Sequence, residues 1–266
     1  MADLNTQGAV QVGLWEWTQR VMVDAITVAV WEPVKPFRDA GILKAWNTFE
    51  ANILNLSVFP MPWLFFPRLF RARELVAAAF ISYMHNNAHE KSSLLVRMLY
   101  EHNHHQFGLG VEDIGRGQLG IAFAMFGKSA PCALWLLYHV FSSCQVLAAV
   151  RWEASAIARE NHKDNVNSTF QETLRHRTIS PGIRKVLRNV LIDEQFLLTK
   201  GMILATVQHS NIEARGPDAR EFHYARFMHR GLASGFKRPD KAAFRAFGGG
   251  HDLCPGRHFA SFEIMP

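Results

Sequence analysis

The sequence predicts a mainly α-helical fold with a small β region in its last third. Residues 1–50 and 111–160 have the pattern of helices. Short β-favouring runs follow at 186–192 and 195–208, with a turn at 199–201. Hydrophobic residues make up 48% of the chain and charged residues 20%, which is typical of a folded protein with a sizeable core.

The second helical region contains a break or kink at Gly127 and Pro131. The stretch 132–150 that follows carries no formal charge. A membrane-spanning helix needs about 20 mainly apolar residues. Because this stretch includes polar residues such as His139 and Gln145, a buried core helix is favoured over a membrane span.

The segment 57–73 combines prolines, a tryptophan and phenylalanines with Arg68, Arg71 and Arg73. Two interpretations compete. One is a buried loop that leads into a helix starting at Glu74, and it is slightly favoured. The other is an aromatic and basic patch that rests on a membrane surface.

The chain is moderately basic, because 29 Lys and Arg residues outnumber 23 Asp and Glu residues and give a net charge of +6. No zinc-finger spacing, RNA-binding signature or long basic helix accompanies this charge. We therefore expect no nucleic-acid partner. A mildly basic face for an acidic partner or a membrane surface fits the charge equally well.

The chain has three widely spaced cysteines, Cys132, Cys144 and Cys254, and no Cys-x-x-Cys pair. This pattern argues against a disulfide framework and indicates a reducing compartment, or a membrane face exposed to one, in which a single cysteine can act as a thiolate.

Two histidine clusters raise the question of a metal site. His85 and His89 are four residues apart, a spacing that puts two imidazoles on one face of a helix, but the sequence places no third ligand. His102, His104 and His105 are expected in a loop between helices. We interpret both clusters as solvated surface histidines.

The most informative stretch is 247–257, FGGGHDLCPGR, which holds Cys254 between glycines and a predicted helix start. Pro255 suits the first position of a helix, which would place the sulfur at a helix N-terminus, where a thiolate is favoured. Three interpretations remain open from these residues. The sulfur is a redox or nucleophilic thiol, an axial ligand of haem iron, or part of a structural turn.

The pattern Phe247-x-x-Gly250-x-x-x-Cys254-x-Gly256 resembles the haem-binding signature of the cytochrome P450 monooxygenases. The resemblance implies haem b as cofactor and Cys254 as the axial ligand of its iron. It also implies that Phe247, Gly250, His251 and Gly256 contact the haem.

Two further segments resemble features of the same family. Glu172-Thr-Leu-Arg175 is similar to the family's Glu-x-x-Arg helix, and residues 217–227 are similar to its Phe-x-Pro-x-Arg-Phe segment. The resemblance implies that Glu172, Arg175 and Arg226 form a buried structural ion triad. Such a triad needs every partner, because removing one leaves a buried charge without compensation.

The resemblance implies a partial cytochrome P450 fold in one domain over residues 1–266. Residues 1–110 would form a helical substrate-side region, and 111–160 the long central helices, of which 119–141 look like the helix that crosses the haem face. Residues 165–266 would hold the Glu-x-x-Arg helix, a small sheet and the haem-binding loop. The chain resembles fungal members and the branch of sterol 7α-hydroxylases and prostacyclin synthase.

The sequence departs from the family pattern at several positions. Asp252 stands where a basic residue usually meets a haem propionate, for which His251 is the available substitute, and Tyr224 replaces a proline. In the central helix Ser129 is the candidate alcohol for a proton relay. No acid accompanies it, and Lys128 beside it is expected to point away from the haem or to lose its proton through burial.

The resemblance covers the family's C-terminal half. It leaves out the membrane anchor, the early helices that close one side of the haem pocket, and the closing strands. We therefore expect a chain that is truncated at both ends.

The resemblance implies a haem-thiolate monooxygenase that hydroxylates a lipophilic small molecule, sterol-like or of secondary metabolism. Oxygen would be activated with electrons that a reductase takes from NADPH, at the cytoplasmic face of the endoplasmic reticulum membrane. Three alternatives remain open. They are a haem-thiolate isomerase that acts on a peroxide, suggested by the missing acid, a noncatalytic remnant, and a thiol enzyme.

Overall fold

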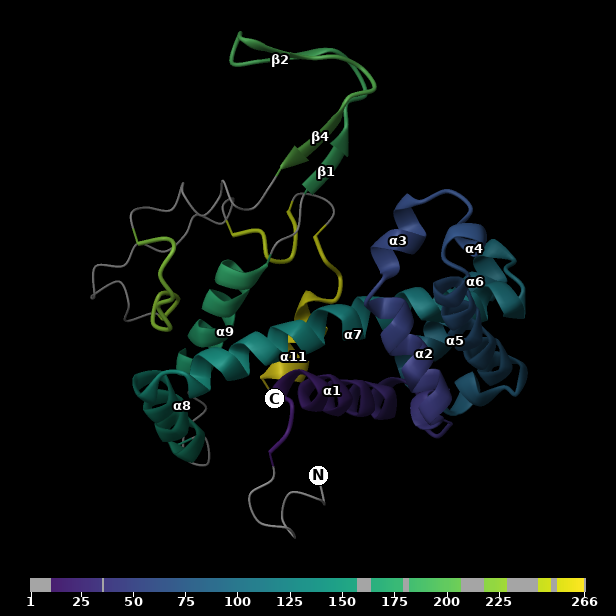
Figure 1. Cartoon of the computed structure of the whole chain (residues 1–266), viewed down its shortest axis with the longest axis horizontal. Coiled ribbons are helices and arrows are strands. Elements are labelled where there is room, and N and C mark those ends of the chain that lie inside the picture. Colours follow the sequence, from purple (N-terminus) through teal and green to yellow (C-terminus); the bar gives the residue numbers. More distant parts are fainter. Residues whose placement is uncertain are drawn as a thin grey trace. The chain divides into compact units, whose positions relative to one another are not determined.

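The computed structural model describes residues 11–34, 36–156, 164–178, 182–206, 218–228, 244–249 and 253–265 (Figure 1). The chain divides into two compact units, residues 1–131 and 132–266. The predicted mainly helical architecture with a small β region is confirmed. The prediction of a single domain over 1–266 stays a prediction.

The first unit consists of helices and their connections in the part of it that the structure describes. Its elements are α1 (Leu14–Trp31), η2 (Pro36–Arg38), α2 (Ala40–Glu50), α3 (Ile53–Val58), α4 (Pro62–Phe65), α5 (Pro67–His85), η3 (Ala88–Lys91), α6 (Leu94–Phe107) and the first part of α7 (Val111–Phe141).

An aromatic cluster forms the core of this unit. The ring of Phe126 on α7 lies 5.9 Å from Trp31, 5.2 Å from Phe37 and 5.3 Å from Trp46, all in edge-to-face contacts. The Trp31 indole N–H donates to the buried side chain of Gln118 over 3.1 Å, so the polar part of the ring is also satisfied. The face of α7 that carries Phe126 therefore packs on α1, η2 and α2.

The helices begin and end where local chemistry allows. The Asp39 side chain accepts from the Gly41 N–H at the start of α2, and Ser93 accepts from the Val96 N–H at the start of α6. Gly108, with φ of +64°, ends α6 in a left-handed conformation that glycine adopts at little cost.

The expected buried loop at 57–73 is wrong. Most of this segment is helical, and α5 starts at Pro67, seven residues before the expected Glu74. Proline favours the first turn of a helix, where its missing N–H has no intrahelical partner. The side chains of Phe59, Met61, Trp63, Leu64 and Phe65 are exposed, which we call the 59–65 patch.

The interpretation as surface histidines is confirmed for the exposed side chains of His85, His102, His104 and His105, but the expected placement of both clusters needs correction. His102, His104 and His105 lie inside α6 and not in a loop. His85 is the last residue of α5, whereas His89 lies in η3 after a left-handed turn, so the two do not share a helical face.

His89 is buried and stacks on Tyr100, with ring centroids 3.9 Å apart, so it is not a solvated surface residue. Among the described residues, no group of His, Cys, Asp and Glu side chains could hold a metal ion.

The second unit contains the end of α7, further helices and two short antiparallel ladders. Its elements are α8 (Cys144–Ala156), α9 (Asp164–Arg177), β1 (Gly182–Lys185), β2 (Val190–Ile192), β3 (Phe196–Leu198), β4 (Ile203–Thr206) and α11 (Arg257–Ile264).

The predicted β region forms one arm made of two ladders (Figure 1). β1 pairs with β4, with Gly182 opposite Thr206, and β2 pairs with β3, with Val190 opposite Leu198. The predicted turn is present, since the Met202 N–H donates to the Thr199 carbonyl and Gly201 has φ of +95°.

α7 continues through Gly127 and Pro131, so neither residue ends the helix. The uncharged stretch 132–150 is divided between α7 and α8. Of the helices in the described part of the chain, α7 is long and apolar enough to cross a membrane. Length and composition alone are weak evidence for a span, because core helices of soluble proteins share them.

α5 and α7 approach each other closely at Gly115. A substitution at this crossing tests the packing of the first unit. A Cβ added at Gly115 would lie 2.8 Å from the Cα of Ile81. We expect Gly115→Ala to lower the free energy of unfolding by about 1–2 kcal/mol, because overpacking exceeds the gain in helix propensity. Chemical denaturation measures this change.

Gly117→Ala is the matched control on the same helix. Nothing lies within 4 Å of a Cβ at Gly117, so alanine should raise the free energy of unfolding by up to about 1 kcal/mol. Equal stabilisation by both substitutions would contradict the close crossing.

Candidate functional site

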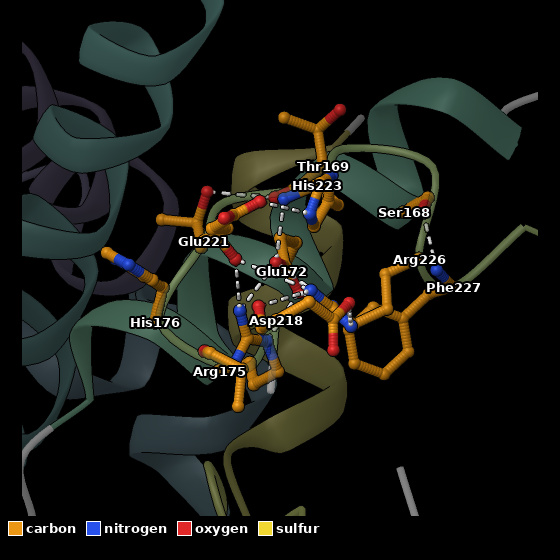
Figure 2. Close-up of polar contacts among 12 residues, drawn as sticks. Ser168, Thr169, Glu172, Arg175, His176, Asp218, Glu221, His223, Arg226 and Phe227 are labelled. Atoms are coloured by element: carbon orange, nitrogen blue, oxygen red, sulfur yellow. Dashed lines mark hydrogen bonds and ion pairs between the residues drawn. The ribbon is translucent and has the colours of Figure 1, made fainter. Parts of the chain in front are cut away.

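A buried ion triad joins α9 to residues 218–228 (Figure 2). Glu172 and Arg175 are one helical turn apart, so their side chains lie on the same face of α9. The Arg175 Nε and Nη2 donate to the two carboxylate oxygens of Glu172 over 2.6 and 2.7 Å. This two-point geometry is the strong form of an arginine–carboxylate pair.

Arg226 brings the second guanidinium to the same carboxylate. Its Nε lies 3.2 Å from both oxygens of Glu172, and its Nη1 donates to Asp218 over 2.9 Å. The exposed fractions of Glu172, Arg175 and Arg226 are 0%, 1% and 4%. The structure therefore brings all three predicted residues together away from water.

Backbone groups complete the triad. The Ala219 and Glu221 carbonyls accept from Arg175 over 2.5 and 2.8 Å, and the His223 N–H donates to Glu172 over 2.9 Å. A buried charge is tolerated only when its remaining hydrogen-bonding capacity is met. The conformation of residues 219–223 is therefore part of what satisfies the triad.

Asp218 is a member of this network that the sequence interpretation missed. The hydrogen bond from Arg226 holds the pKa of the Asp218 carboxyl below its usual value. Because its folded-state pKa is lowered, Asp218 contributes stability above its unfolded-state pKa and loses that contribution as the pH falls. The sequence clue to this role is that Asp218 lies in the same segment as Arg226, eight residues before it.

Glu153 on α8 supports the start of α9. Its buried carboxylate accepts from the Asn165 and Val166 N–H groups over 3.0 and 2.8 Å. These N–H groups have no partner within the helix, and a negative charge is favourable at a helix N-terminus. α9 is thus anchored by another helix before it presents Glu172.

Cys254 lies on a closed turn before α11. Its N–H donates to the Phe247 carbonyl over 2.9 Å, and its own carbonyl accepts from the Arg257 N–H over 3.4 Å. Gly248 has φ of +82°, a conformation that favours glycine. The hydrogen bond that closes the turn joins Phe247 to Cys254. Phe247 is the first residue of the signature, and Cys254 is its proposed ligand.

The helix after Cys254 begins later than expected. α11 starts at Arg257 with Gly256 as N-cap, so Pro255 lies in the preceding turn and not at the first helical position. Pro255 still restricts the backbone of this turn, because the proline ring fixes its own φ. Gly250, His251 and Asp252 lie outside the described residues.

Contacts between aromatic residues connect the triad segment to the cysteine turn. The Phe227 N–H, next to Arg226, donates to Ser168 on α9 over 2.9 Å. The Phe227 ring lies 5.3 Å from that of Phe244, three residues before Phe247. A series of contacts thus runs from α9 to the segment that closes on Cys254.

The donor chemistry of the cysteine turn fits a haem iron. Thiolate is one of the axial ligands of haem proteins, and Cys254 is only partly buried, on a turn that is fixed by backbone hydrogen bonds. Burial raises the pKa of the Cys132 thiol to about 12, so this second cysteine stays protonated at neutral pH. The hydrogen-bonded turn around Cys254 and the raised pKa of the Cys132 thiol therefore favour Cys254 as a ligand.

Ser129 is buried in α7 and belongs to the first unit. Lys128 beside it is exposed, and its Nζ lies 5.8 Å from the Phe123 ring.

An acid that the sequence interpretation missed lies next to this segment. The Glu50 carboxylate on α2 lies 3.2 Å from where a Cβ at Gly127 would be. Burial raises the pKa of Glu50, although Gln19 and Trp46 donate to its carboxylate.

The triad predicts a large response to loss of its carboxylate. We expect Glu172→Gln to lower the free energy of unfolding by about 3–5 kcal/mol, because two buried guanidinium groups lose their counter-charge. Chemical denaturation measures the change.

Glu221→Gln is the matched control for this substitution. The Glu221 side chain is exposed, and its backbone carbonyl, which serves the triad, is unaffected. We expect a change of about 0.5 kcal/mol or less, as for other surface substitutions. A Glu172→Gln protein as stable as this control would contradict the importance of the triad.

Comparisons with known proteins agree with this geometry. A family model described as Cytochrome P450 matches residues 86–265. The cytochrome P450 monooxygenase nodJ of Hypoxylon pulicicidum is 27% identical, over 99% of this chain and 56% of the relative. Abscisic acid 8'-hydroxylase 4 of Arabidopsis thaliana is 23% identical, over 73% of this chain and 40% of the relative. The chain thus spans about half the length, or less, of these curated relatives.

Solved structures agree on the fold. The crystal structure of the cytochrome P450DA heme domain superposes with a TM-score of 0.77 at 17% identity, covering 97% of this chain and 60% of that chain. At this identity the likeness concerns the fold alone. The family model covers more than half of the chain and includes α9, its triad and the Cys254 turn, and the chain therefore belongs to the cytochrome P450 family.

Proposed function

We propose that the protein functions as a haem-thiolate monooxygenase in which Cys254 is the axial ligand of haem b iron. The observation that carries this proposal is the turn closed between Phe247 and Cys254, which holds a thiol sulfur next to the start of α11. A bound haem would supply the activation of molecular oxygen. The relatives named as monooxygenases support the same reaction.

The residues of this chain take separate roles in the proposal. Phe247, Gly250, His251 and Gly256 would contact the haem around its ligand. Glu172, Arg175 and Arg226 are scaffold, because their hydrogen-bonding groups are used by one another and by the backbone. Ser129 is the proposed proton relay, as a buried alcohol in the central helix.

The proposed substrate is a lipophilic small molecule, sterol-like or of secondary metabolism, which is hydroxylated. A relative named as an abscisic acid hydroxylase supports hydroxylation of a small molecule. The proposed electron source is an NADPH-dependent cytochrome P450 reductase. The net charge of +6 supports docking of an acidic partner of this kind.

The ligand assignment predicts a spectroscopic result. We expect the full chain, expressed with haem available, to show the carbon monoxide shift of a thiolate-ligated ferrous haem. Cys254→Ser should abolish this shift because it removes the sulfur. Cys144→Ser should retain it, because Cys144 is an exposed cysteine at the start of α8.

A Cys254→Ser protein with the unchanged spectrum would refute the ligand assignment. Turnover of a peroxide without oxygen or reductant would instead identify a haem-thiolate isomerase.

We also propose that the 59–65 patch contacts a membrane, at the cytoplasmic face of the endoplasmic reticulum. The exposed fractions of Trp63, Leu64 and Phe65 are 57%, 63% and 57%, which is high for large apolar side chains close in sequence. Arg68 and Arg71 at the start of α5 are also exposed, so cationic groups flank the patch. Aromatic and basic residues together favour an anionic lipid surface.

The patch predicts binding to lipid vesicles. We expect the double substitution Trp63→Ala and Phe65→Ala to weaken binding to vesicles of phosphatidylcholine and phosphatidylserine by more than about tenfold, because each large apolar side chain contributes about 1.5–3 kcal/mol on burial. Cosedimentation measures the partition coefficient.

The control replaces Phe107 and Trp152 by alanine. These side chains have exposed fractions of 66% and 69% and lie outside the patch. An equal loss of vesicle binding in the control would contradict a specific role for the 59–65 patch.

A further inference from the structure

Backbone groups of residues 219–223 form hydrogen bonds with the triad. A side chain that fixes the conformation of this loop therefore also stabilises the triad. The Glu221 carbonyl accepts from Arg175, and the His223 N–H donates to Glu172. Phe222 lies between these two residues, and its side chain is therefore placed to fix both backbone groups.

Phe222 is seated on the end of α7. Its ring stacks face to face on His139, with centroids 3.7 Å apart and an interplanar angle of 6°. The His176 ring of α9 meets Phe222 edge-on at 6.1 Å. His139 is 9% exposed, so the stack is shielded from water. An aromatic pair of this kind contributes about 0.5–1.5 kcal/mol beyond its area.

His139 also contacts the helix that carries the triad. The Arg177 Nε on α9 donates to the His139 Nε2 over 3.3 Å, and the guanidinium lies 3.6 Å above the Trp135 ring. A ring nitrogen that accepts a hydrogen bond carries no proton, so the imidazole is neutral and its proton is on Nδ1. One imidazole therefore contacts both the loop and α9.

The surrounding charges keep this imidazole neutral. Burial, with Arg177 and His176 as nearby cationic or titratable groups of α9, lowers the pKa of His139 to about 4. Tyr138 faces it from α7, and on the loop side the Arg220 carbonyl is hydrogen-bonded to His176. A protonated His139 would lose the Arg177 bond and face a like charge.

We propose that His139 is a positioning residue for the triad: its ring seats Phe222 and its Nε2 fixes Arg177, so that the 219–223 backbone meets Glu172 and Arg175. This role goes beyond the proposed monooxygenase function, because it concerns the fold that supports the cysteine turn. It does not depend on bound haem.

The test uses the guanidinium Nε–H signals of Arg175 and Arg226 in NMR spectra of the full chain. Both groups bond to Glu172, so slow exchange of their protons with water reports an intact triad. We expect His139→Ala to accelerate this exchange by about tenfold, the upper value of an aromatic pair. His139→Phe should restore most of the protection, since it keeps a flat ring against Phe222.

pH dependence separates positioning from general stabilisation. The exchange rates of the arginine Nε–H protons are first corrected for the direct effect of pH on exchange. In the unmodified chain the corrected rates should then rise as His139 gains its proton near pH 4. In His139→Phe the acceleration should be smaller, since no imidazole remains to titrate and only the loss of the Asp218 contribution to the triad is left. His258→Ala, at an exposed histidine of α11, is the matched control and should retain the full acceleration.

A measurement without any substitution keeps the proposal testable if a variant does not fold. Nitrogen-15 spectra of His139 should show a proton on Nδ1 at pH 7 and a titration midpoint near the low value given by its surroundings. A proton on Nε2, or a folded His139→Ala chain with unchanged exchange of the arginine protons, would overturn the proposal. Loss of the haem spectrum alone would bear only on the ligand assignment.

Discussion

The buried carboxylate of Glu172 is the constraint on which the described second unit depends. It holds two guanidinium groups away from water, and Asp218 supplies a second negative charge, so four ionised groups balance one another. The desolvation of such charges costs several kcal/mol per ion and is offset only by complete hydrogen bonding. The sequence from 218 to 227 is therefore held to one conformation by the requirement to satisfy Arg175 and Arg226.

α9 can meet this requirement because it is held near both ends. Glu153 satisfies N–H groups in its first turn, and Arg177 near its end is fixed between His139 and Trp135. Ser168 on α9 accepts a hydrogen bond from the Phe227 N–H, and the Phe227 ring contacts Phe244 in the segment that closes on Cys254. A structural network without reactive groups thus supports the turn that presents the proposed ligand.

The sequence interpretation failed at three places, two for local reasons and one because the partner lies far away in the chain. At 57–73 the prolines suggested a loop, but Pro62 and Pro67 begin helices instead of breaking them. The spacing of His85 and His89 suggested one helical face, but the left-handed Asn87 separates them. No acid stands beside Ser129 in the sequence of the central helix, but Glu50 from α2 lies 3.2 Å from where a Cβ at Gly127 would be.

The sequence by itself determined the helical class, the small β region, the pairing of Glu172 with Arg175 and the glycine-flanked position of Cys254. These features depend on residues close in the chain, whose geometry is set by helical periodicity and by glycine and proline conformations. Tertiary structure decided which backbone carbonyls receive Arg175, that Asp218 and Glu153 join the network, and that Phe222 stacks on His139. Those contacts join separate segments of the folded chain, and they stabilise it only when burial removes the competing water.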